Sequence, residues 1–471
     1  MAVVTLAVVD AAAAQETKTI GLRAAIAEAL TSSPRLSAPE DAMTLAQIHQ
    51  RQQAARFATK LVPTLDAGTN PGGFDQRTIG LGVSRKLPFG TDVQASVTSI
   101  QYGTGSAAFQ DAGYSIGISQ PLLRGLVDPR FDADQARRGV DTARHARVDA
   151  RQQLVVSAAA TYLDVLRARQ LVENAERAAE RSSLLHAASE ARAKVGLDTE
   201  LDVMRATLLQ SQAASSLSED RERLDSALDA LKALLGRDLN SDIDVEDVDL
   251  SDESLTALGL APTPEGELQP GGDADVNRLV STALAHRTDV QESRDRITDA
   301  RRAEKVARWN LLPPLTLNVG YTRRGIGSPG DVFGSLMTGW RFGISSSYAL
   351  DHADEQAAAA AAAVSVRAAE RSSADTDRAA TTEVRQAWRA WRRTADVIAI
   401  QQTTVDLEER QARVAHLRYE RGLAGNFDVI DAENNLYQAQ SGLIAARVNR
   451  ALAGLALRRA AGLLNPDAFR P

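Results

Sequence analysis

Residues 194–203 read Lys194-Val-Gly-Leu-Asp-Thr-Glu-Leu-Asp-Val203, and residues 420–429 read Glu420-Arg-Gly-Leu-Ala-Gly-Asn-Phe-Asp-Val429. The two strings share a Gly-Leu pair and an Asp-Val pair at a constant offset of 226 residues. The same offset pairs Gln212 with Gln438 and Gly236 with Gly462. Self-similarity at a fixed period indicates two copies of one structural unit, so the fold has to be derived from that unit.

Both halves of the chain run through the same order of elements. Upstream of the repeated strings, Leu61-Val-Pro-Thr-Leu65 is similar to Leu311-Leu-Pro-Pro-Leu315. We expect each half to contain short helices, a proline-marked switch, strands, one very long helix, a glycine turn and a second helix. A shared order of elements supports a duplication better than any single matching string does.

Proline placement limits where the long helices lie. Residues 130–261 and 330–465 contain no proline, and a proline in a helix interior costs about 3 kcal/mol. We predict uninterrupted helices over Phe131–Lys194 and Ala353–Glu420, the first reaching roughly 96 Å at 1.5 Å per residue. The first helix carries two adjacent apolar seams, Leu154, Ala158, Val165, Ala168, Val172, Ala175 and Ala179 in one and Val155, Ala159, Tyr162 and Leu166 in the other. Two seams predict helix neighbours on both sides, as in a closed ring of helices.

Strand character is confined to the segment between the proline switch and the long helix of each half. Alternating apolar and small polar residues predict strands over residues 64–69, 78–86, 93–102 and 114–120, and over 316–321 and 339–348. The first half carries an extra hairpin around Pro88-Phe-Gly90, which we expect to extend the sheet or its external loop. So few strands cannot bury both faces, but strands pooled from several copies could close a barrel, the only form in which strands span lipid.

Composition and charge exclude several other classes of protein. The chain has 471 residues, of which 4% are aromatic, and we find no stretch apolar enough to span a bilayer as a helix. The formal net charge is −7, but residues 238–275 hold twelve acids and no Lys or Arg, which predicts a solvated acidic linker. Basic residues elsewhere alternate with acids along helices, so we expect no nucleic acid as a partner.

The first fourteen residues are typical of the end of a secretory signal. They form an apolar run that closes in Ala12-Ala13-Ala14 before polar residues, so we predict a signal-peptide remnant there. The chain has no cysteine, which suits an exported protein without disulfides and excludes a lipid-anchoring cysteine.

These features predict a mainly α fold with a membrane β-barrel. Two internal repeats of long helical hairpins would form an α-barrel coiled coil, and each chain would contribute four or more strands to a β-barrel shared among several copies. The predicted segments are a signal-peptide remnant (1–14), first-repeat short helices (15–62), first-repeat barrel strands with an extra hairpin (63–121), the first long helical hairpin (122–237), an acidic linker (238–275), second-repeat helices (276–312), second-repeat barrel strands (313–350), the second long helical hairpin (351–464) and a C-terminal tail (465–471).

The order of elements resembles the TolC-like outer-membrane efflux channel family, also called outer membrane factors, over nearly the whole chain. Ala25-Ile-Ala-Glu-Ala-Leu30 followed by Ser33-Pro34 is similar to the family's opening helix and its Asn-Pro break. Ser119-Gln-Pro-Leu-Leu-Arg-Gly125 is similar to the string that leads from a strand into the long helix, and Phe427-Asp-Val-Ile-Asp431 to the turn at the periplasmic tip. In two places the chain departs from the family, because the proline expected near Asp351 is absent and the hairpin around Pro88 is additional.

The resemblance implies a homotrimer in the outer membrane of a Gram-negative bacterium, extending into the periplasm. Each protomer would give four strands to one twelve-stranded barrel and its long helices to a tunnel. The implied partners are a periplasmic adaptor (membrane fusion) protein, an inner-membrane transporter and outer-membrane lipid. The implied function is that of a passive conduit in an efflux pump or a type I secretion system, gated at its periplasmic tip.

By the same resemblance, the candidate tip carboxylates are Asp428 and Asp431. They would form a ring that narrows the closed channel and binds cations, since three-fold symmetry brings like charges together. Their spacing of three residues places them on one helix face. Alternatively, Asp428 caps the helix after the turn, as its repeat counterpart Asp202 suggests; the counterpart of Asp431 is Arg205.

The remaining candidate site residues lie in the two glycine turns. Tyr419 matches a tip tyrosine that the family uses to hold the channel shut, although the arginine expected nearby is Ala424 here. The adaptor-contact turns implied by the resemblance are Gly196, Leu197, Gly422 and Leu423. Independently of that role, glycine permits a tight left-handed turn between antiparallel helices.

An enzyme and a soluble scaffold are the two other classes of protein considered. The six histidines show no metal-ligand spacing, and the chain has no phosphate loop or nucleophile elbow, so we expect neither catalysis nor a cofactor nor a metal site. A soluble structural coiled-coil scaffold would also use alanine-rich seams. In such a scaffold, the outward-facing apolar side chains of residues 78–86 and 339–348 would have no function.

Overall fold

A computed structural model describes residues 19–69, 75–103, 108–124, 126–248, 250, 254, 273–328, 336–347 and 351–469. The predicted signal remnant, most of the acidic linker beyond residue 248, Gly72-Gly73, Gly125 and residues 348–350 lie outside the described residues. The chain divides into two compact units. One contains residues up to Ala38, Arg147–Thr288 and the chain from Arg378 onward, and the other contains Pro39–Ala146 and Asp289–Asp377.

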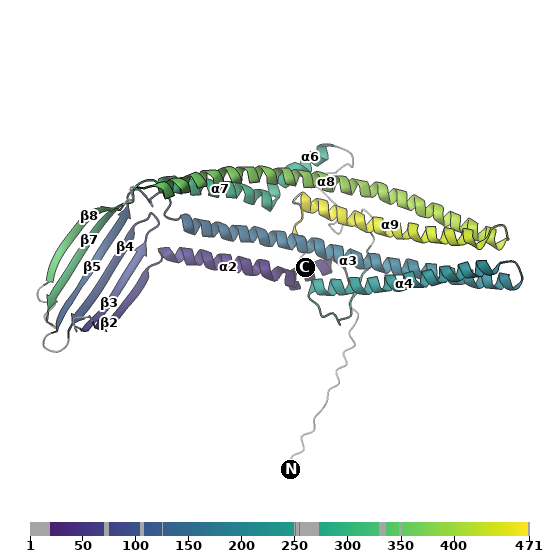
Figure 1. Cartoon of the computed structure of the whole chain (residues 1–471), viewed down its shortest axis with the longest axis horizontal. Helices are drawn as coiled ribbons and strands as arrows, with labels where there is room; N and C mark the ends of the chain where they lie inside the picture. The colour runs from purple at the N-terminus through teal and green to yellow at the C-terminus, as the bar shows by residue number, and fades with distance from the viewer. Residues whose placement is uncertain are drawn as a thin grey trace, which may run out of the picture. The chain divides into compact units, whose positions relative to one another are not determined.

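A single antiparallel sheet of six strands occupies the second unit (Figure 1). Its strands are β2 (Lys60–Thr69), β3 (Asp75–Lys86), β4 (Asp92–Tyr102), β5 (Phe109–Pro121), β7 (Leu315–Gly327) and β8 (Leu336–Ser346), and this is also their order in the sheet. All six strands were predicted, but most begin a few residues earlier than expected, because pairing with a neighbour extends them beyond the alternating residues. The resemblance implied four strands per chain, and the sheet has six.

The two faces of this sheet differ in chemistry. The cross-strand register places these apolar side chains on one face: Leu61, Leu65, Ile79, Leu81, Val83, Val93, Val97, Tyr114, Ile116, Ile118, Leu317, Val319, Tyr321, Trp340, Phe342 and Ile344. The opposite face carries mainly serine, threonine, glycine, asparagine and the Asp111–Arg324 ion pair, with a smaller number of apolar side chains, among them Val62, Ile326 and Met337. On β3 and β5 the apolar face is the more exposed one; Ile79 is 64% exposed, and Trp340 on β8 is 66% exposed. This exposure is the reverse of that in a sheet folded for water.

The long helices have the predicted bounds. Helix α3 runs from Phe131 to Lys194 and α8 from Ala353 to Glu420, with 64 and 68 residues. Each is followed by a short glycine turn and a second helix, α4 (Glu200–Leu235) after α3 and α9 (Asn426–Ala460) after α8. Shorter helices complete the described fold: α1 (Leu22–Ser32), α2 (Ser37–Ala54), α6 (Asp273–His286) and α7 (Thr288–Trp309).

The core of the first unit lies around the middle of α3. Most residues of its two predicted seams are buried there against α1, α4 and α9. Two short parallel strands, β1 (Thr19–Ile20) and β6 (Asp244–Val245), close this core, so part of the predicted acidic linker is paired. The hydroxyl of Tyr162 donates to the carbonyl oxygens of Ile20 and Glu246, and burial raises its pKa to about 12.

Within the described part of the chain, no helix combines the length and hydropathy needed to cross a lipid bilayer.

Candidate functional site

Two glycine turns end the long helices in the same conformation. Gly196 has φ +76° and Gly422 has φ +68°, a left-handed conformation that L side chains rarely adopt. In each turn the N–H of the following leucine donates to a carbonyl five residues back, at 2.9 Å for Leu197 and 2.8 Å for Leu423. Both leucines are 67% exposed, so each turn presents an apolar side chain at its surface.

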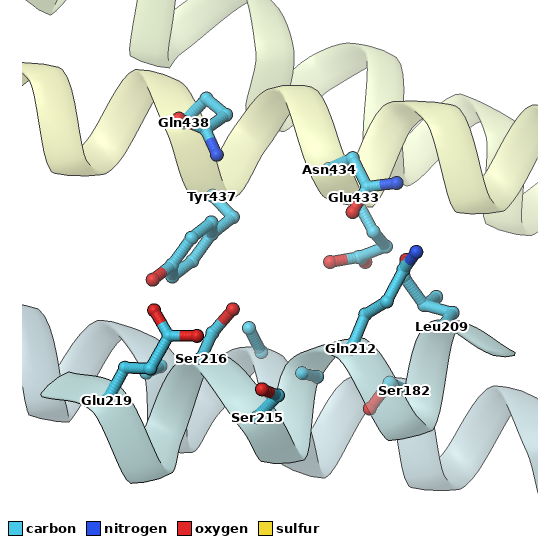
Figure 2. Close-up of a pocket in the computed structure, with 13 residues that line it drawn as sticks. Ser182, Leu209, Gln212, Ser215, Ser216, Glu219, Glu433, Asn434, Tyr437 and Gln438 are labelled. Atoms are coloured by element: carbon cyan, nitrogen blue, oxygen red, sulfur yellow. The ribbon is translucent and has the colours of Figure 1, made fainter. Parts of the chain in front are cut away.

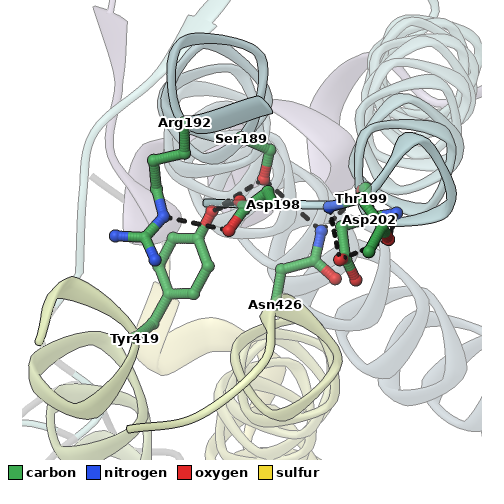
Figure 3. A network of polar contacts seen from close by, with 7 residues as sticks. All are labelled: Ser189, Arg192, Asp198, Thr199, Asp202, Tyr419 and Asn426. Carbon is green, nitrogen blue, oxygen red and sulfur yellow. Dashed lines mark hydrogen bonds and ion pairs between the residues drawn. The ribbon is translucent and has the colours of Figure 1, made fainter. Parts of the chain in front are cut away.

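The tip network, defined as Ser189, Arg192, Asp198, Asp202, Tyr419 and Asn426, joins the two helical hairpins next to these turns (Figure 3). The Tyr419 hydroxyl donates to Asp198 Oδ2 at 2.5 Å and shares a hydrogen bond of 2.9 Å with Ser189 Oγ. Arg192 Nε donates to Asp198 Oδ1 at 3.0 Å, and its guanidinium lies 4.6 Å from the centre of the Tyr419 ring. Asp198 therefore holds a tyrosine from α8 and an arginine from α3 at the same time.

Burial determines the electrostatics of the tip network. Tyr419 is 4% exposed; burial, and then its hydrogen bond to Asp198, raise the pKa of its hydroxyl. The hydrogen bond to Asp198 raises the pKa of Arg192. At neutral pH the tyrosine is consequently a neutral donor and the arginine a cation, which is the combination that an aspartate with two oxygens can bind.

A second contact of the tip network uses the first residue of α9. Asn426 is buried, and its Nδ2 donates to the backbone oxygen of Asp202 at 2.6 Å and to Ser189 Oγ at 3.4 Å. The contact joins the start of α9 to the start of α4. The start of the second hairpin's return helix is thus fixed by a side chain that reaches the first hairpin.

The two return helices begin with different caps. At α4, the Thr199 hydroxyl accepts from the Asp202 backbone N–H at 3.2 Å, and the Thr199 N–H donates to the Asp202 carboxylate at 3.1 Å, a capping box that lowers the pKa of Asp202. At α9, the corresponding N-cap is Gly425, which makes no side-chain cap. Capping was the alternative role for Asp428, and the capping box of its counterpart has no equivalent at α9.

Both candidate ring carboxylates are exposed. Asp428 and Asp431 lie in the first two turns of α9 on its solvent side, and Asn435 Nδ2 donates to Asp431 Oδ2 at 3.4 Å. Neither belongs to the tip network. Tyr419 is the predicted site residue that the structure brings into contact with other polar side chains of the tip.

A buried carboxylate lies farther along α9. Glu433 is 9% exposed and accepts from Arg181 Nε at 2.5 Å and from His416 Nε2 at 2.8 Å. Burial acts to raise its pKa, but the hydrogen bonds and charges of His416 and Arg181 outweigh burial and lower it. Glu433 therefore links three helices, α3, α8 and α9, through one carboxylate.

A polar pocket of about 380 Å³ lies between α3, α4 and α9 beside Glu433 (Figure 2). In Figure 2, Tyr437 and Glu433 extend from α9 toward Gln212 and Ser216 on α4. The Tyr437 hydroxyl donates to Asp220 Oδ2 at 3.0 Å, and burial raises its pKa to about 12. Part of the seam between the hairpins is therefore polar and open. Beside it, Leu185 and Leu209 of the first hairpin pack with Val429 and Leu436 of α9 in a buried apolar cluster.

Among the side chains that the structure describes, no group of three or more His, Cys, Asp or Glu could hold a metal ion within one chain. The acidic side chains of the tip network are already bonded to Arg192, Tyr419 and Thr199.

The family model that matches this chain is described as outer membrane efflux protein, and it covers residues 279–463. The matched residues are thus similar to the outer membrane efflux protein family. They contain α7, both second-half strands, α8 and α9, and therefore Tyr419, Asp428, Asp431 and Glu433.

Solved structures that are similar to the whole chain extend this comparison to the fold. A crystal structure of CusC, in a study of transmembrane channel formation, has 17% identity and a TM-score of 0.71, over 94% of this chain and 92% of that one. The Campylobacter jejuni CmeC outer membrane channel has 16% identity and a TM-score of 0.69, over 95% and 88%. The Vibrio cholerae outer membrane protein VceC has 20% identity and a TM-score of 0.68, over 94% and 96%. No curated protein sequence matches the chain.

Sequence reasoning missed Asp198, Arg192, Asn426 and Glu433. A signal for Asp198 was present, because the offset of 226 residues pairs it with Ala424, the position whose expected arginine is missing. Asn426 and Glu433 gave no such signal, since a polar residue on a helix is normally exposed.

Proposed function

We propose that this chain is the protomer of a trimeric outer-membrane channel, a passive conduit that extends into the periplasm of a Gram-negative bacterium. The observation that carries the proposal is the sheet with an exposed apolar face and a polar face behind it. A water-filled barrel in lipid needs this arrangement, with apolar residues outside and polar residues inside. The match of residues 279–463 to the outer membrane efflux protein family model and the likeness to channel structures support the same function.

The proposed channel is part of a tripartite export system. A periplasmic adaptor would contact the exposed turns at Gly196-Leu197 and Gly422-Leu423, and an inner-membrane transporter would supply the substrate. A wide aqueous conduit has no need for a catalytic group, and its specificity comes from the transporter that loads it. The substrates are therefore solutes or polypeptides selected elsewhere in the system.

The tip network is the proposed gate. Tyr419 and Asp198 tie the second hairpin to the first, and opening requires the second hairpin to move away from the first. The polar pocket beside Glu433 leaves open space in part of the contact between the hairpins. Separating the hairpins there loses fewer packing contacts than separating a fully packed core would. Asp428 and Asp431, exposed on α9, would form the carboxylate ring at this end of the conduit.

The experiment that tests the proposed function is fractionation of the full-length protein with its mass measured in detergent. We expect the protein in the outer-membrane fraction, extractable only with detergent, as a trimer that forms ion-conducting channels in planar bilayers. A monomer in the soluble fraction without detergent would instead support the coiled-coil scaffold. The apolar outer face of the sheet disfavours that alternative, because it would be exposed to water.

A further inference from the structure

The six-stranded ladder is continuous from one edge to the other. All residues of β2 pair with β3, from Lys60 opposite Ser84 to Thr69 opposite Asp75, and pairing continues through β4, β5, β7 and β8. Strands β2 and β8 stand at the two ends of this order. Each therefore has one side with no strand partner among the described residues, which is where another chain can add a strand.

The strands beyond the four implied by the resemblance belong to the same continuous sheet. Leu65 on β2 lies opposite Ile79 on β3, and Leu81 on β3 lies opposite Val97 on β4. The apolar band thus crosses β2 and β3 without a break. A hairpin folded away as an external loop would have no reason to keep this band in register with its neighbours.

The turn around Pro88 also fits a barrel wall. Gly90 has φ +90°, and Leu87 N–H donates to the Thr91 carbonyl at 2.7 Å, so β3 returns directly into β4. The Thr91 hydroxyl donates to the side chain of Gln120 at the end of β5. The turn is therefore fixed to the neighbouring strand.

Six is an even number, and this determines how two edges can meet. All five pairings are antiparallel, so β2 and β8 run in opposite directions. The β8 edge of one chain can then pair with the β2 edge of a second copy without breaking the antiparallel pattern. One chain alone has fewer strands than the smallest membrane barrels, which have about eight.

We propose that β2 of each chain pairs with β8 of the next, so that three chains of six strands close one eighteen-stranded barrel. The proposal rests on the trimer of the proposed function. With strands about 4.8 Å apart and tilted by about 40°, eighteen strands give a backbone radius of about 18 Å, against about 12 Å for twelve. The outer-membrane end of this conduit is then about 1.5-fold wider than the resemblance implied.

Disulfide trapping in the full-length protein tests the proposed edge pairing, because the chain has no cysteine of its own. We would combine Gly68→Cys on β2 with Gly339→Cys or Gly343→Cys on β8, three positions on the polar face where an added Cβ meets nothing within 4 Å. The matched control combines Thr98→Cys on β4 with the same β8 variants. Thr98 is on the polar face but inside the ladder, opposite Gly80 and Gly113.

Covalent trimers from the Gly68 pairs, and none from the Thr98 pairs, are the expected result. Trimers linked through Thr98 alone would overturn the eighteen-stranded barrel, because β4 would then be the edge of a twelve-stranded one. A trimer in detergent that no β2–β8 pair links would overturn it as well. A monomer that links in neither set would overturn the proposed function itself.

A strand count by electron cryomicroscopy of the cysteine-free protein in lipid nanodiscs gives an independent answer. Eighteen strands around the barrel would support the proposal, and twelve would contradict it whatever the cysteine variants do.

Discussion

At the scale of single residues, the tip depends on one aspartate with two different donors. Asp198 binds a neutral hydroxyl from Tyr419 and a cation from Arg192, so it ties the hairpins without leaving a buried charge unpaired. In the family, by the resemblance, an arginine takes part at this tip, and Ala424 stands there instead. Here Arg192 of the first hairpin supplies a guanidinium to the tyrosine and its aspartate.

The first prediction concerns Tyr419→Phe. Removing the hydroxyl deletes a hydrogen bond to a charged acceptor, which is worth about 1.5 kcal/mol, and shifts the balance toward the open tip by about tenfold per protomer. We expect higher mean conductance in planar bilayers. The matched control is Tyr162→Phe, which removes a buried hydroxyl bonded to the carbonyls of Ile20 and Glu246 rather than to the other hairpin, and it should leave conductance nearly unchanged. Equal effects of the two variants would show that the tip has no special role.

The second prediction concerns Asp428 and Asp431, the two exposed carboxylates on α9. Replacing both Asp428 and Asp431 with alanine removes six carboxylates from a trimer. At about 0.3 kcal/mol for each exposed charge, block by a multivalent cation should weaken about twentyfold. Asp406→Ala, which removes an exposed carboxylate from α8 well before the turn, is the control. Unchanged block in the double variant would remove these residues from the proposed ring.

At the scale of elements, Glu433 links three helices, and this contact depends on pH. The pKa of Glu433 is lowered in the fold, so its contribution to stability is complete above the unfolded value of about 4.3 and is lost as pH falls through the folded value. The neutral glutamine of Glu433→Gln leaves Arg181 with a weaker partner.

For Glu433→Gln we expect a loss of about 3 kcal/mol at pH 7 and a melting temperature that falls less on acidification than that of the unchanged protein. Circular dichroism melts between pH 7 and pH 3 measure both effects. The control is Glu173→Gln, because the Glu173 side chain is 66% exposed in its pair with Arg177, and it should cost under about 0.5 kcal/mol. An identical pH profile for both variants would contradict the assigned role of Glu433.

Some features of the helices and strands could be predicted from the sequence, and others could not. The long helices were predicted with their observed bounds. Proline-free stretches and the glycine turns that end the helices are both local signals in the sequence. The ends of a strand depend on hydrogen bonding to the neighbouring strand. Strand β2 therefore begins at Lys60, before its alternating sequence pattern starts. The tip network joins Asp198 to a tyrosine 221 residues away, and no local pattern reports such a contact.

The cap of α4 shows how two positions that match at the offset of 226 residues can differ in structure. Asp202 and Asp428 are offset partners, so capping was open for both of them. The capping box also needs the hydroxyl of Thr199, and the partner of that residue is Gly425. The missing hydroxyl explains why the capping box of α4 has no equivalent at α9, although the two aspartates match at the offset of 226 residues.

At the scale of the whole molecule, the last prediction concerns the outer face of the sheet. Leu81→Arg on β3 would place a cation toward lipid at a cost of about 2–4 kcal/mol, so we expect less trimer in the outer-membrane fraction. Ser96→Arg on β4, which adds the same side chain to the polar face beside Gly82, should assemble at nearly the normal level. The two yields, compared by quantitative immunoblotting, decide whether the apolar face is the one that meets lipid.

The unpaired edges of the sheet at β2 and β8 also affect the folding and assembly of a newly made chain. Until β2 and β8 find partners, each copy carries two unpaired strand edges next to an apolar face, the combination that most readily seeds aggregation. In the proposed barrel the partner is another copy, so correct closure accelerates with concentration, and so does mispairing. We therefore expect synthesis of this protein to depend on chaperones that hold single chains apart before they reach the membrane, and overproduction to yield inclusion bodies before it yields more channels.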